Sequence, residues 1–345
     1  TKRKKGIRKM RKCVAVGDMF IHPEDFRQAF EQYPIFDTCR YITWKEDADR
    51  QEARAIIRRI ETEGSAAYPP DQQLFCEIED AEAVFLHLCP ISREVIERAK
   101  HLKYILTCRG GVENIDMEAA RENGVTVVNC PEHNAYAVAE YTIGLMICEM
   151  RNIARADRAL KNGKWREQYP NSGKIREMRN ISIGLIGFGT IGRLVAERLK
   201  GFGSRILIHD PFVAAEEIEK EGYLPMEKEE LLREADVVTL HGRIGPGEPP
   251  LIGAKELKMM KKDAYLINTA RAALVDMDAL YRALKEEQIL GAAIDVFPTE
   301  PIAPDDPIAH LDHVTAGNHR GGDTLESYTK APEAVLLKLQ EQYGE

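Results

Sequence analysis

The chain has 345 residues, of which 44% are hydrophobic, so it can bury a large core and is long enough for two domains. Its formal net charge of −8 argues against general nucleic-acid binding. No apolar run approaches the roughly 18 residues that a membrane helix needs, and without a signal-peptide pattern we expect a cytoplasmic protein.

Two compositional features need an interpretation before the elements are taken in order. Seven cysteines occur without a C-x-x-C pair, mostly in apolar runs, so we expect buried, reduced thiols and no metal site. The first twelve residues contain eight Lys or Arg. We interpret them as a solvated tail, with a basic arm for nucleic acid or a targeting signal as the alternative.

The N-terminal third alternates strands and helices. Strands are predicted at 13–16, 83–88, 103–107 and 125–128, and helices at 23–30, 50–60 and 92–99. A stretch rich in Gly, Pro and Ser at 61–73 indicates a surface loop. This βαβ rhythm predicts a parallel sheet covered by helices.

Residues 135–149 are apolar nearly all round, which predicts a helix that is buried on several sides. Crossing between domains and packing against a second subunit both fit this pattern. Residues 151–179 are polar, and Trp165, Pro170 and Gly173 interrupt any periodicity. They predict irregular surface structure.

A glycine motif follows at the centre of the chain. The apolar run 181–186 predicts a strand, Gly187, Gly189 and Gly192 have the spacing G-x-G-x-x-G, and 191–199 predicts a helix. Gly187 allows the tight turn out of the strand. Gly189 lets a pyrophosphate approach the backbone, and Gly192 lets the helix pack against the strand.

The surroundings of the motif favour NAD. The N–H groups and the dipole at the start of the predicted helix can hold the phosphate charge. A second strand at 205–209 ends at Asp210, 18 residues after Gly192, where a carboxylate can bind ribose hydroxyls and repel the extra phosphate of NADP. The alternative is a glycine-rich turn in another α/β domain, with Asp210 as a strand-end cap.

The alternation of strands and helices resumes after Asp210. Strands are predicted at 236–241, 264–268, 289–296 and 313–316, with a helix at 277–287 and a final helical stretch at 325–343 that Pro332 breaks.

Three of these strands end in reactive side chains, namely Arg271, Glu300 and His319. In an open α/β sheet such ends face the ligand. Arg271 can hold a substrate carboxylate with its fork. His319 can protonate a carbonyl oxygen near neutral pH, and Glu300 beside it would favour the imidazolium and fix the ring orientation. Taken singly, each could instead be a surface ion pair, a loop residue or a turn residue.

The ordered motifs between about residues 83 and 327 resemble the NAD-dependent D-isomer-specific 2-hydroxyacid dehydrogenases. They are residues 109–116, 127–129 and 134–140, the glycine motif, His241, and residues 268–271, 291–301 and 319–322. The resemblance implies an α/β protein of two Rossmann-like or flavodoxin-like domains with parallel sheets. An NAD-binding domain of residues 134–319 would be inserted into a substrate domain that is made of residues 1–133 and 320–345. A homodimer formed partly by 135–149 is implied as well.

The resemblance also implies roles for individual residues. The catalytic residues would be Arg271, Glu300 and His319. The cofactor-binding residues would be Gly187, Gly189, Thr190, Ile191, Gly192, Asp210, His241, Thr269 and Asp295, with Asp295 beside the nicotinamide carboxamide. The substrate-binding residues would be Arg109, Gly110, Asn134 and Arg271.

Several positions depart from the family pattern. Ala272 stands where many relatives have glycine, Asn318 replaces the usual proline, and the loop at 242–249 is unusual. Arg109 and Arg243 could recognise a second acidic group on the substrate or could be solvated.

We therefore expect an NAD(H)-dependent oxidoreductase acting on a small D-2-hydroxy acid or its 2-oxo acid. 3-Phosphoglycerate, glyoxylate and hydroxypyruvate are the substrates considered, and neither nucleic acid nor membrane is expected as a partner. The alternatives are an NAD(H)-sensing binding protein of the same fold and a phosphite-type dehydrogenase. Formate is disfavoured, because that branch of the family carries a glutamine in place of Glu300.

Overall fold

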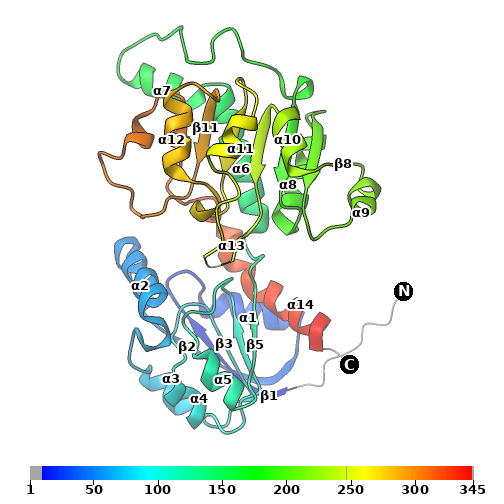
Figure 1. The fold of residues 1–345 in the computed structure, drawn as a ribbon. Coiled ribbons are helices and arrows are strands. Elements are labelled where there is room, and N and C mark those ends of the chain that lie inside the picture. The colour runs from blue at the N-terminus through cyan, green and yellow to red at the C-terminus, as the bar shows by residue number, and fades with distance from the viewer. Residues whose placement is uncertain (1–9, 246, 344–345) are drawn as a thin grey trace. The chain divides into compact units, whose positions relative to one another are not determined.

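A computed structural model of the chain describes residues 10–245 and 247–343, so most of the basic N-terminal tail lies outside the described residues. The chain divides into two compact units: Thr1–Asn134 with Thr324–Glu345, and Ala135–Asp323. Each unit contains one parallel sheet (Figure 1). The predicted α/β class with two parallel sheets is confirmed. No helix within the described ranges combines the length and the hydrophobicity needed to span a bilayer.

The first unit has a five-stranded sheet in the order β2-β1-β3-β4-β5. The strands are β1 (Met10–Gly17), β2 (Phe36–Thr43), β3 (Ala83–Leu86), β4 (Tyr104–Thr107) and β5 (Thr126–Asn129). This is the flavodoxin-like order, in which the chain changes direction across the sheet between β1 and β3. Ligands of such sheets bind beside the carboxyl ends of the two strands at that switch point.

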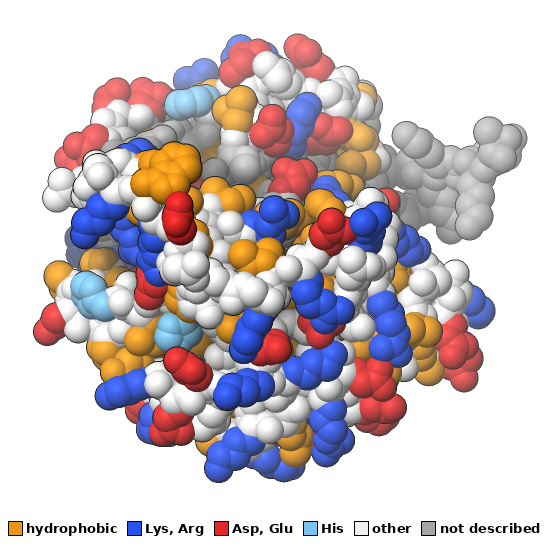
Figure 2. All heavy atoms as spheres, turned by 90° about the horizontal axis from the view of Figure 1, so that it is seen from above, with side chains coloured by type: hydrophobic (Ala, Val, Ile, Leu, Met, Phe, Trp, Pro, Cys, Tyr) orange, Lys and Arg blue, Asp and Glu red, His pale blue; other side chains and the backbone are white. Residues whose placement is uncertain are grey.

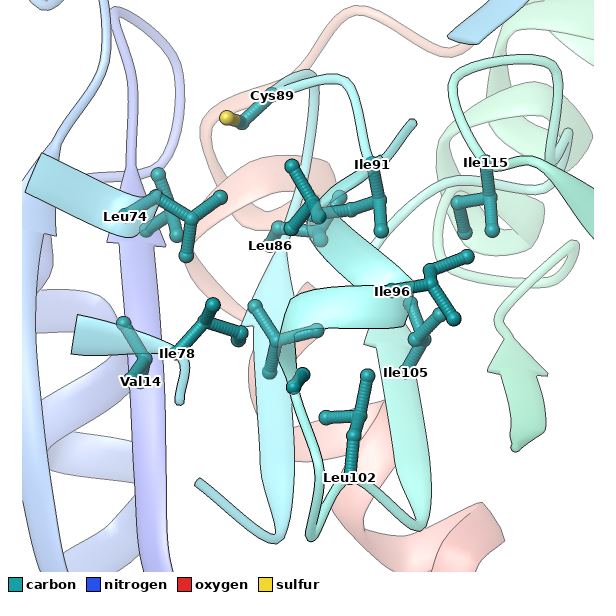
Figure 3. Close-up of a cluster of buried hydrophobic side chains, with 14 of the residues drawn as sticks. Val14, Leu74, Ile78, Leu86, Cys89, Ile91, Ile96, Leu102, Ile105 and Ile115 are labelled. Carbon is teal, nitrogen blue, oxygen red and sulfur yellow. The ribbon is translucent and has the colours of Figure 1, made fainter. Parts of the chain in front are cut away.

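Helices cover both faces of this sheet. They are α1 (Pro23–Gln32), α2 (Arg50–Glu63), α3 (Gln72–Glu77), α4 (Arg93–Arg98), α5 (Met117–Glu122), α13 (Leu325–Thr329) and α14 (Ala331–Tyr343), with a 3₁₀ turn η1 (Gly64–Ala66). Alternate residues of β1 point to opposite faces, as a strand requires. Val14 packs under α2–α5 with the side chains drawn in Figure 3, whereas Cys13 packs under α1 and α14.

The second unit has a seven-stranded sheet in the order β12-β11-β10-β9-β6-β7-β8. The strands are β6 (Ser182–Ile186), β7 (Arg205–His209), β8 (Leu224–Pro225), β9 (Val237–Leu240), β10 (Tyr265–Asn268), β11 (Gly291–Ile294) and β12 (Val314–Ala316). Counted from β6, the first six strands have the Rossmann order 3-2-1-4-5-6. The switch point lies between β6 and β9, directly beside the glycine motif.

The helices of the second unit are α6 (Ala135–Met150), α7 (Ile153–Lys161), α8 (Thr190–Lys200), α9 (Ala215–Lys220), α10 (Lys228–Glu234), α11 (Ala254–Met259) and α12 (Met277–Lys285). The 3₁₀ turns are η2 (Met178–Asn180), η3 (Ala272–Leu274) and η4 (Pro307–His310). The apolar helix α6 contacts α8 and the strands β10, β11 and β12. Its hydrophobic residues are therefore largely covered inside its own unit.

Four details of the predicted elements are wrong. Residues 153–161 form α7 rather than irregular surface, because Ala, Arg, Leu and Lys are strong helix formers even where the pattern is polar. The predicted loop at 61–73 contains the end of α2 and the start of α3. Strand β1 begins at Met10, inside the expected tail. The C-terminal helix breaks at Lys330, and Pro332 lies in the first turn of α14, where proline is tolerated.

Charged side chains of both signs are interspersed on the face in Figure 2. Exposed ion pairs such as Lys161–Asp157, with an N–O distance of 2.8 Å, contribute at most about 1 kcal/mol each. The cores under the two sheets therefore dominate stability, and the net negative charge is spread rather than gathered on this face.

Candidate active site

The glycine motif forms the turn between β6 and α8, and each glycine meets a different constraint. Gly187 has φ +103°, and a Cβ there would lie 2.4 Å from the backbone nitrogen of Gly242. A Cβ on Gly192 would lie 2.3 Å from the carbonyl oxygen of Gly187, so the helix packs directly on the turn. A Cβ on Gly189 would meet no described atom within 4 Å. The exposed backbone at Gly189, directly before the start of α8, is therefore open to a phosphate group.

Asp210 lies beside this turn at the end of β7. Its carboxylate accepts the N–H of Phe188 at 2.6 Å on one oxygen and the N–H of Phe212 at 2.8 Å on the other. A carboxylate has about four acceptor sites, so these two bonds leave capacity for ribose hydroxyls. The Phe188 bond ties Asp210 to the glycine turn, so the carboxylate lies beside the place where a dinucleotide's phosphates would bind.

The turn after β9 completes the switch point. Gly242 lies against Gly187, and the preceding His241 has its Nε2 3.1 Å from the hydroxyl of Thr239. Burial lowers the pKa of His241 to about 4, so its ring is neutral at pH 7. Arg243 is exposed, and no ion pair joins it to another residue of the described chain.

The end of β10 presents Arg271. Asn268 brackets the turn, because its side chain accepts the N–H of Ala270 at 3.1 Å and donates to the carbonyl of Arg271 at 2.9 Å. The exposed Arg271 guanidinium donates to the Ala270 carbonyl at 2.8 Å and has no carboxylate partner among the described residues. Its remaining N–H groups are therefore available to an anion.

Thr269 is buried and points toward α6. Its hydroxyl lies 2.6 Å from that of Thr142, which itself donates to a carbonyl one turn earlier in α6 at 2.7 Å. A hydroxyl has one proton to donate, so Thr269 is the donor to Thr142. Helix α6 thereby fixes the strand end two residues before Arg271.

Glu300 and His319 are brought together from different strand ends. His319 Nδ1 lies 2.7 Å from one Glu300 oxygen, and the other oxygen accepts the N–H of Phe297 at 2.9 Å. The carboxylate accepts a hydrogen bond from Nδ1–H, which leaves Nε2 as the second ring nitrogen. The His319 side chain is 54% exposed, so Nε2 can be reached from outside the protein.

Asp295 follows β11 and is 1% exposed. Its carboxylate accepts the N–H groups of Arg320 at 3.0 Å and Gly321 at 2.9 Å, and its carbonyl accepts the N–H of His319 at 2.8 Å. Asp295 thus organises the turn that carries His319. The predicted place of Asp295 beside a nicotinamide stays a prediction.

The predicted substrate residues Arg109, Gly110 and Asn134 belong to the first unit. Arg109 is 11% exposed in its side chain, and its Nη2 lies 3.4 Å from Glu113 and 3.7 Å from Glu61. Its Nη1 is buried without a hydrogen-bond partner among the described residues. Gly110 follows in the same loop, and Asn134 is half-buried at the end of the unit.

Sequence reasoning missed a buried pair in the first unit. Asp18 and His87 follow β1 and β3, the strands at the switch point, and His87 Nδ1 lies 3.0 Å from Asp18. Burial opposes ionisation of Asp18, but His87 and the N–H groups of Phe20 and Ile21 hold the pKa of that carboxyl below its ordinary value. Both residues stand at predicted strand ends, which is the signal that could have identified them.

The sheet order, the glycine turn and Asp210 together define a dinucleotide-binding fold. Residues 143–321 match the family model of the D-isomer specific 2-hydroxyacid dehydrogenase, NAD binding domain. The chain belongs to the D-isomer specific 2-hydroxyacid dehydrogenase family, as its motifs predict.

Named relatives point to the same family. The chain is 37% identical to D-3-phosphoglycerate dehydrogenase of Methanocaldococcus jannaschii over 297 residues, which cover 85% of the chain and 56% of that relative. It is 37% identical to glyoxylate reductase of Korarchaeum cryptofilum over 277 residues, covering 79% of the chain and 82% of that relative. The chain thus spans little more than half the length of the phosphoglycerate dehydrogenase. A solved glyoxylate reductase from Paecilomyes thermophila has a TM-score of 0.68 at 26% identity, over 97% of each chain.

Proposed function

We propose that the protein is an NAD(H)-dependent oxidoreductase that interconverts a small D-2-hydroxy acid and its 2-oxo acid. The observation that carries this proposal is the 2.7 Å contact between His319 and Glu300. The pair follows strands of the sheet that also bears the glycine turn. Relatives named phosphoglycerate dehydrogenase and glyoxylate reductase support the same chemistry.

Each residue has a separate task in this reaction. Arg271 holds the substrate carboxylate through two parallel N–H···O bonds. The Nε2 of His319 donates a proton to the carbonyl oxygen during reduction and takes it back during oxidation, while Glu300 keeps the ring oriented. When bound, NADH supplies the hydride that the carbonyl carbon accepts.

The residues that would hold the cofactor fit a dinucleotide without a 2′-phosphate. The open backbone at Gly189 accommodates the pyrophosphate, and Gly192 keeps the helix start close to it. Asp210 has acceptor capacity for the ribose hydroxyls, and its charge disfavours NADP. We therefore assign Ala135–Asp323 as the NAD-binding unit and the other unit as the substrate domain.

Within the substrate domain, Arg109, Gly110 and Asn134 are the proposed substrate ligands. Arg109 already pairs with Glu61 and Glu113, so a second acidic group on the substrate would compete with two carboxylates. This favours a small acid such as glyoxylate or hydroxypyruvate over a phosphorylated one.

The test is NADH consumption against glyoxylate, pyruvate, hydroxypyruvate, 3-phosphohydroxypyruvate and branched 2-oxo acids, with NADPH in parallel. We expect turnover of one unphosphorylated acid with NADH. A phosphorylated best substrate would contradict the assignment of Arg109. If no acid on the panel is reduced although NADH binds tightly by fluorescence, the proposed dehydrogenase activity is refuted and an NAD(H)-sensing protein is favoured.

We also propose a homodimer. Ile153 and Leu160 lie seven residues apart on α7, and hence on one face of the helix, and they are 53% and 56% exposed. The side chain of Trp165 farther along the same unit is 81% exposed. Burying these apolar groups against a second copy would remove them from water. Sedimentation of the wild type and of a Leu160→Glu variant tests this, and a monomeric wild type would refute it.

A cytoplasmic location completes the proposal. The seven cysteines are unpaired, and Cys13 and Cys39 lie opposite each other on β1 and β2 with hydrogen-bonded thiols. Reduced thiols are typical of reducing compartments. Alkylation in fresh lysate should find Cys13 and Cys39 reduced, and a disulfide between them would contradict this location.

A further inference from the structure

The turn that carries His319 has an unusual backbone. His319 has φ +57°, in the left-handed region that non-glycine residues rarely adopt. Such a conformation persists only where the surrounding structure holds it. The direction in which the imidazole points toward Glu300 therefore depends on what holds the turn in place.

Asp295 supplies one part of that support. Its carboxylate and carbonyl together accept three backbone N–H groups from consecutive residues of the turn, His319, Arg320 and Gly321. Its own N–H donates to the carbonyl of Asn268 at 3.0 Å, which anchors it to β10. The orientation of this one buried carboxylate thus sets the path of the turn.

Tyr141 of α6 supplies the other part. A Cβ on Gly317 would lie 2.5 Å from the Tyr141 hydroxyl and 2.0 Å from an oxygen of Asp295. A Cβ on Gly321 would lie 3.4 Å from the tyrosine ring. The tyrosine and the Asp295 carboxylate, whose oxygen would lie 3.2 Å from a Cβ on Gly321, therefore share the space beside two glycines that stand two residues on either side of His319.

The hydroxyl of Tyr141 is hydrogen-bonded to the Asp295 carboxylate. Burial and the nearby carboxylate raise the pKa of Tyr141 to about 12, so the hydroxyl keeps its proton at neutral pH and donates it. The next residue, Thr142, accepts from Thr269 at 2.6 Å. One turn of α6 thus contacts the segments that lead to both His319 and Arg271.

We propose that Tyr141 is a positioning residue that, through its hydrogen bond to Asp295 and its packing on Gly317 and Gly321, holds His319 in its productive orientation. The inference rests on the proposed dehydrogenase function and extends it to a residue outside the catalytic set. It assigns the two glycines a matching task, which is to leave room for the tyrosine and the Asp295 carboxylate that it contacts.

The decisive variant is Tyr141→Phe, which removes one oxygen and keeps the ring. Tyr136→Phe is the matched control, because Tyr136 lies on the same helix with a 67% exposed side chain. We expect Tyr141→Phe to lower kcat about 10- to 100-fold through misplacement of His319. The NADH Kd and the thermal midpoint should stay near wild type, and the control should match wild type in every measurement.

A double-mutant cycle separates positioning from general damage. In a His319→Gln background, Tyr141→Phe should have no further effect on the residual rate, because the group it positions is gone. An equal loss in both backgrounds would overturn the inference, as would a wild-type kcat for Tyr141→Phe. Gly317→Ala is a second test, since its Cβ would separate the tyrosine hydroxyl from Asp295, and it should be non-additive with Tyr141→Phe.

A readout without turnover distinguishes this inference from the proposed function. The imidazole ¹⁵N spectrum, assigned with His319→Gln, reports whether Nδ1 of His319 stays protonated and hydrogen-bonded to Glu300. Loss of that signal in Tyr141→Phe but not in Tyr136→Phe would support the positioning role even if no 2-oxo acid were reduced. An unchanged signal would refute the role whatever the substrate.

Discussion

Replacing Arg155 by Met should destabilise the second unit severely. Arg155 and Glu149 are 3% and 1% exposed, and Nη2 of the arginine lies 2.7 Å from both carboxylate oxygens. The variant keeps an apolar side chain of similar length but leaves the Thr315 hydroxyl, 2.6 Å away, as the remaining side-chain partner of Glu149 among the described residues. Breaking a buried pair in this way costs about 3–5 kcal/mol. At about 2–4 °C per kcal/mol for a domain of this size, the thermal midpoint should fall by roughly 10 °C.

The stability lost in Arg155→Met should depend on pH, and the direction of this dependence follows from the pKa of Glu149. Burial raises the pKa of Glu149, while Arg155 opposes that rise. Without Arg155 the native state holds this proton to still higher pH than the unfolded state does. The free energy of unfolding of the variant should then fall as pH rises through the raised pKa. The destabilisation should therefore be smaller at pH 5 than at pH 8.

Urea unfolding followed by circular dichroism at both pH values measures these effects. Arg158→Met is the matched control on the same helix, because Arg158 is 64% exposed and lies 3.7 Å from Asp312. It should change stability by less than about 1 kcal/mol. Adding Glu149→Leu to Arg155→Met should recover much of the loss. A loss for Arg155→Met below about 1 kcal/mol, or one independent of pH, would refute the reasoning.

Three further predictions concern the candidate active site. His319→Ala should lower kcat by about 10²- to 10⁴-fold while the NADH Kd measured by fluorescence stays within a few-fold, and unchanged turnover would remove His319 from the mechanism. Arg271→Lys should chiefly raise the KM of the 2-oxo acid, by about tenfold or more, because a point charge cannot replace the fork; an unaltered KM would count against that role. Asp210→Asn keeps an acceptor for the Phe188 N–H but loses the charge, so the preference for NADH over NADPH in steady-state kinetics should shrink by at least about tenfold, and a constant ratio would exclude Asp210 as its source.

The sequence predicts those parts of the fold in which local pattern and burial agree. Strands β6, β7, β9 and β10 are short apolar runs inside a parallel sheet, where both faces are covered, so composition alone reveals them. The sequence does not indicate strand β2, because this edge strand carries exposed polar residues. The polar sequence of helix α7 does not predict a buried face, and its helical structure depends on good helix formers and the burial of Arg155.

The residues of the candidate site likewise divide into those that the sequence predicts and those that it does not. Arg271, Glu300 and His319 could be named from sequence, because each follows a recognisable strand and parallel strands bring their carboxyl ends to one edge. The pairing of Asp18 with His87 could not be derived, because it depends on β3 lying next to β1, and that order is decided by packing across the whole sheet.

The role of Tyr141 is the hardest to predict, because no residue near it in the sequence indicates a function. It lies in a helix that is apolar nearly all round, where an aromatic residue is most simply read as core. Its relation to His319 depends on Asp295 and on two glycines 176 and 180 positions later in the chain, Gly317 and Gly321, which lack the side chains that would collide with the tyrosine and the carboxylate. The sequence does not show which distant side chain a glycine makes room for. Side chains that act directly on a ligand can therefore be named from strand ends, whereas the residues that orient them emerge only from the packed structure.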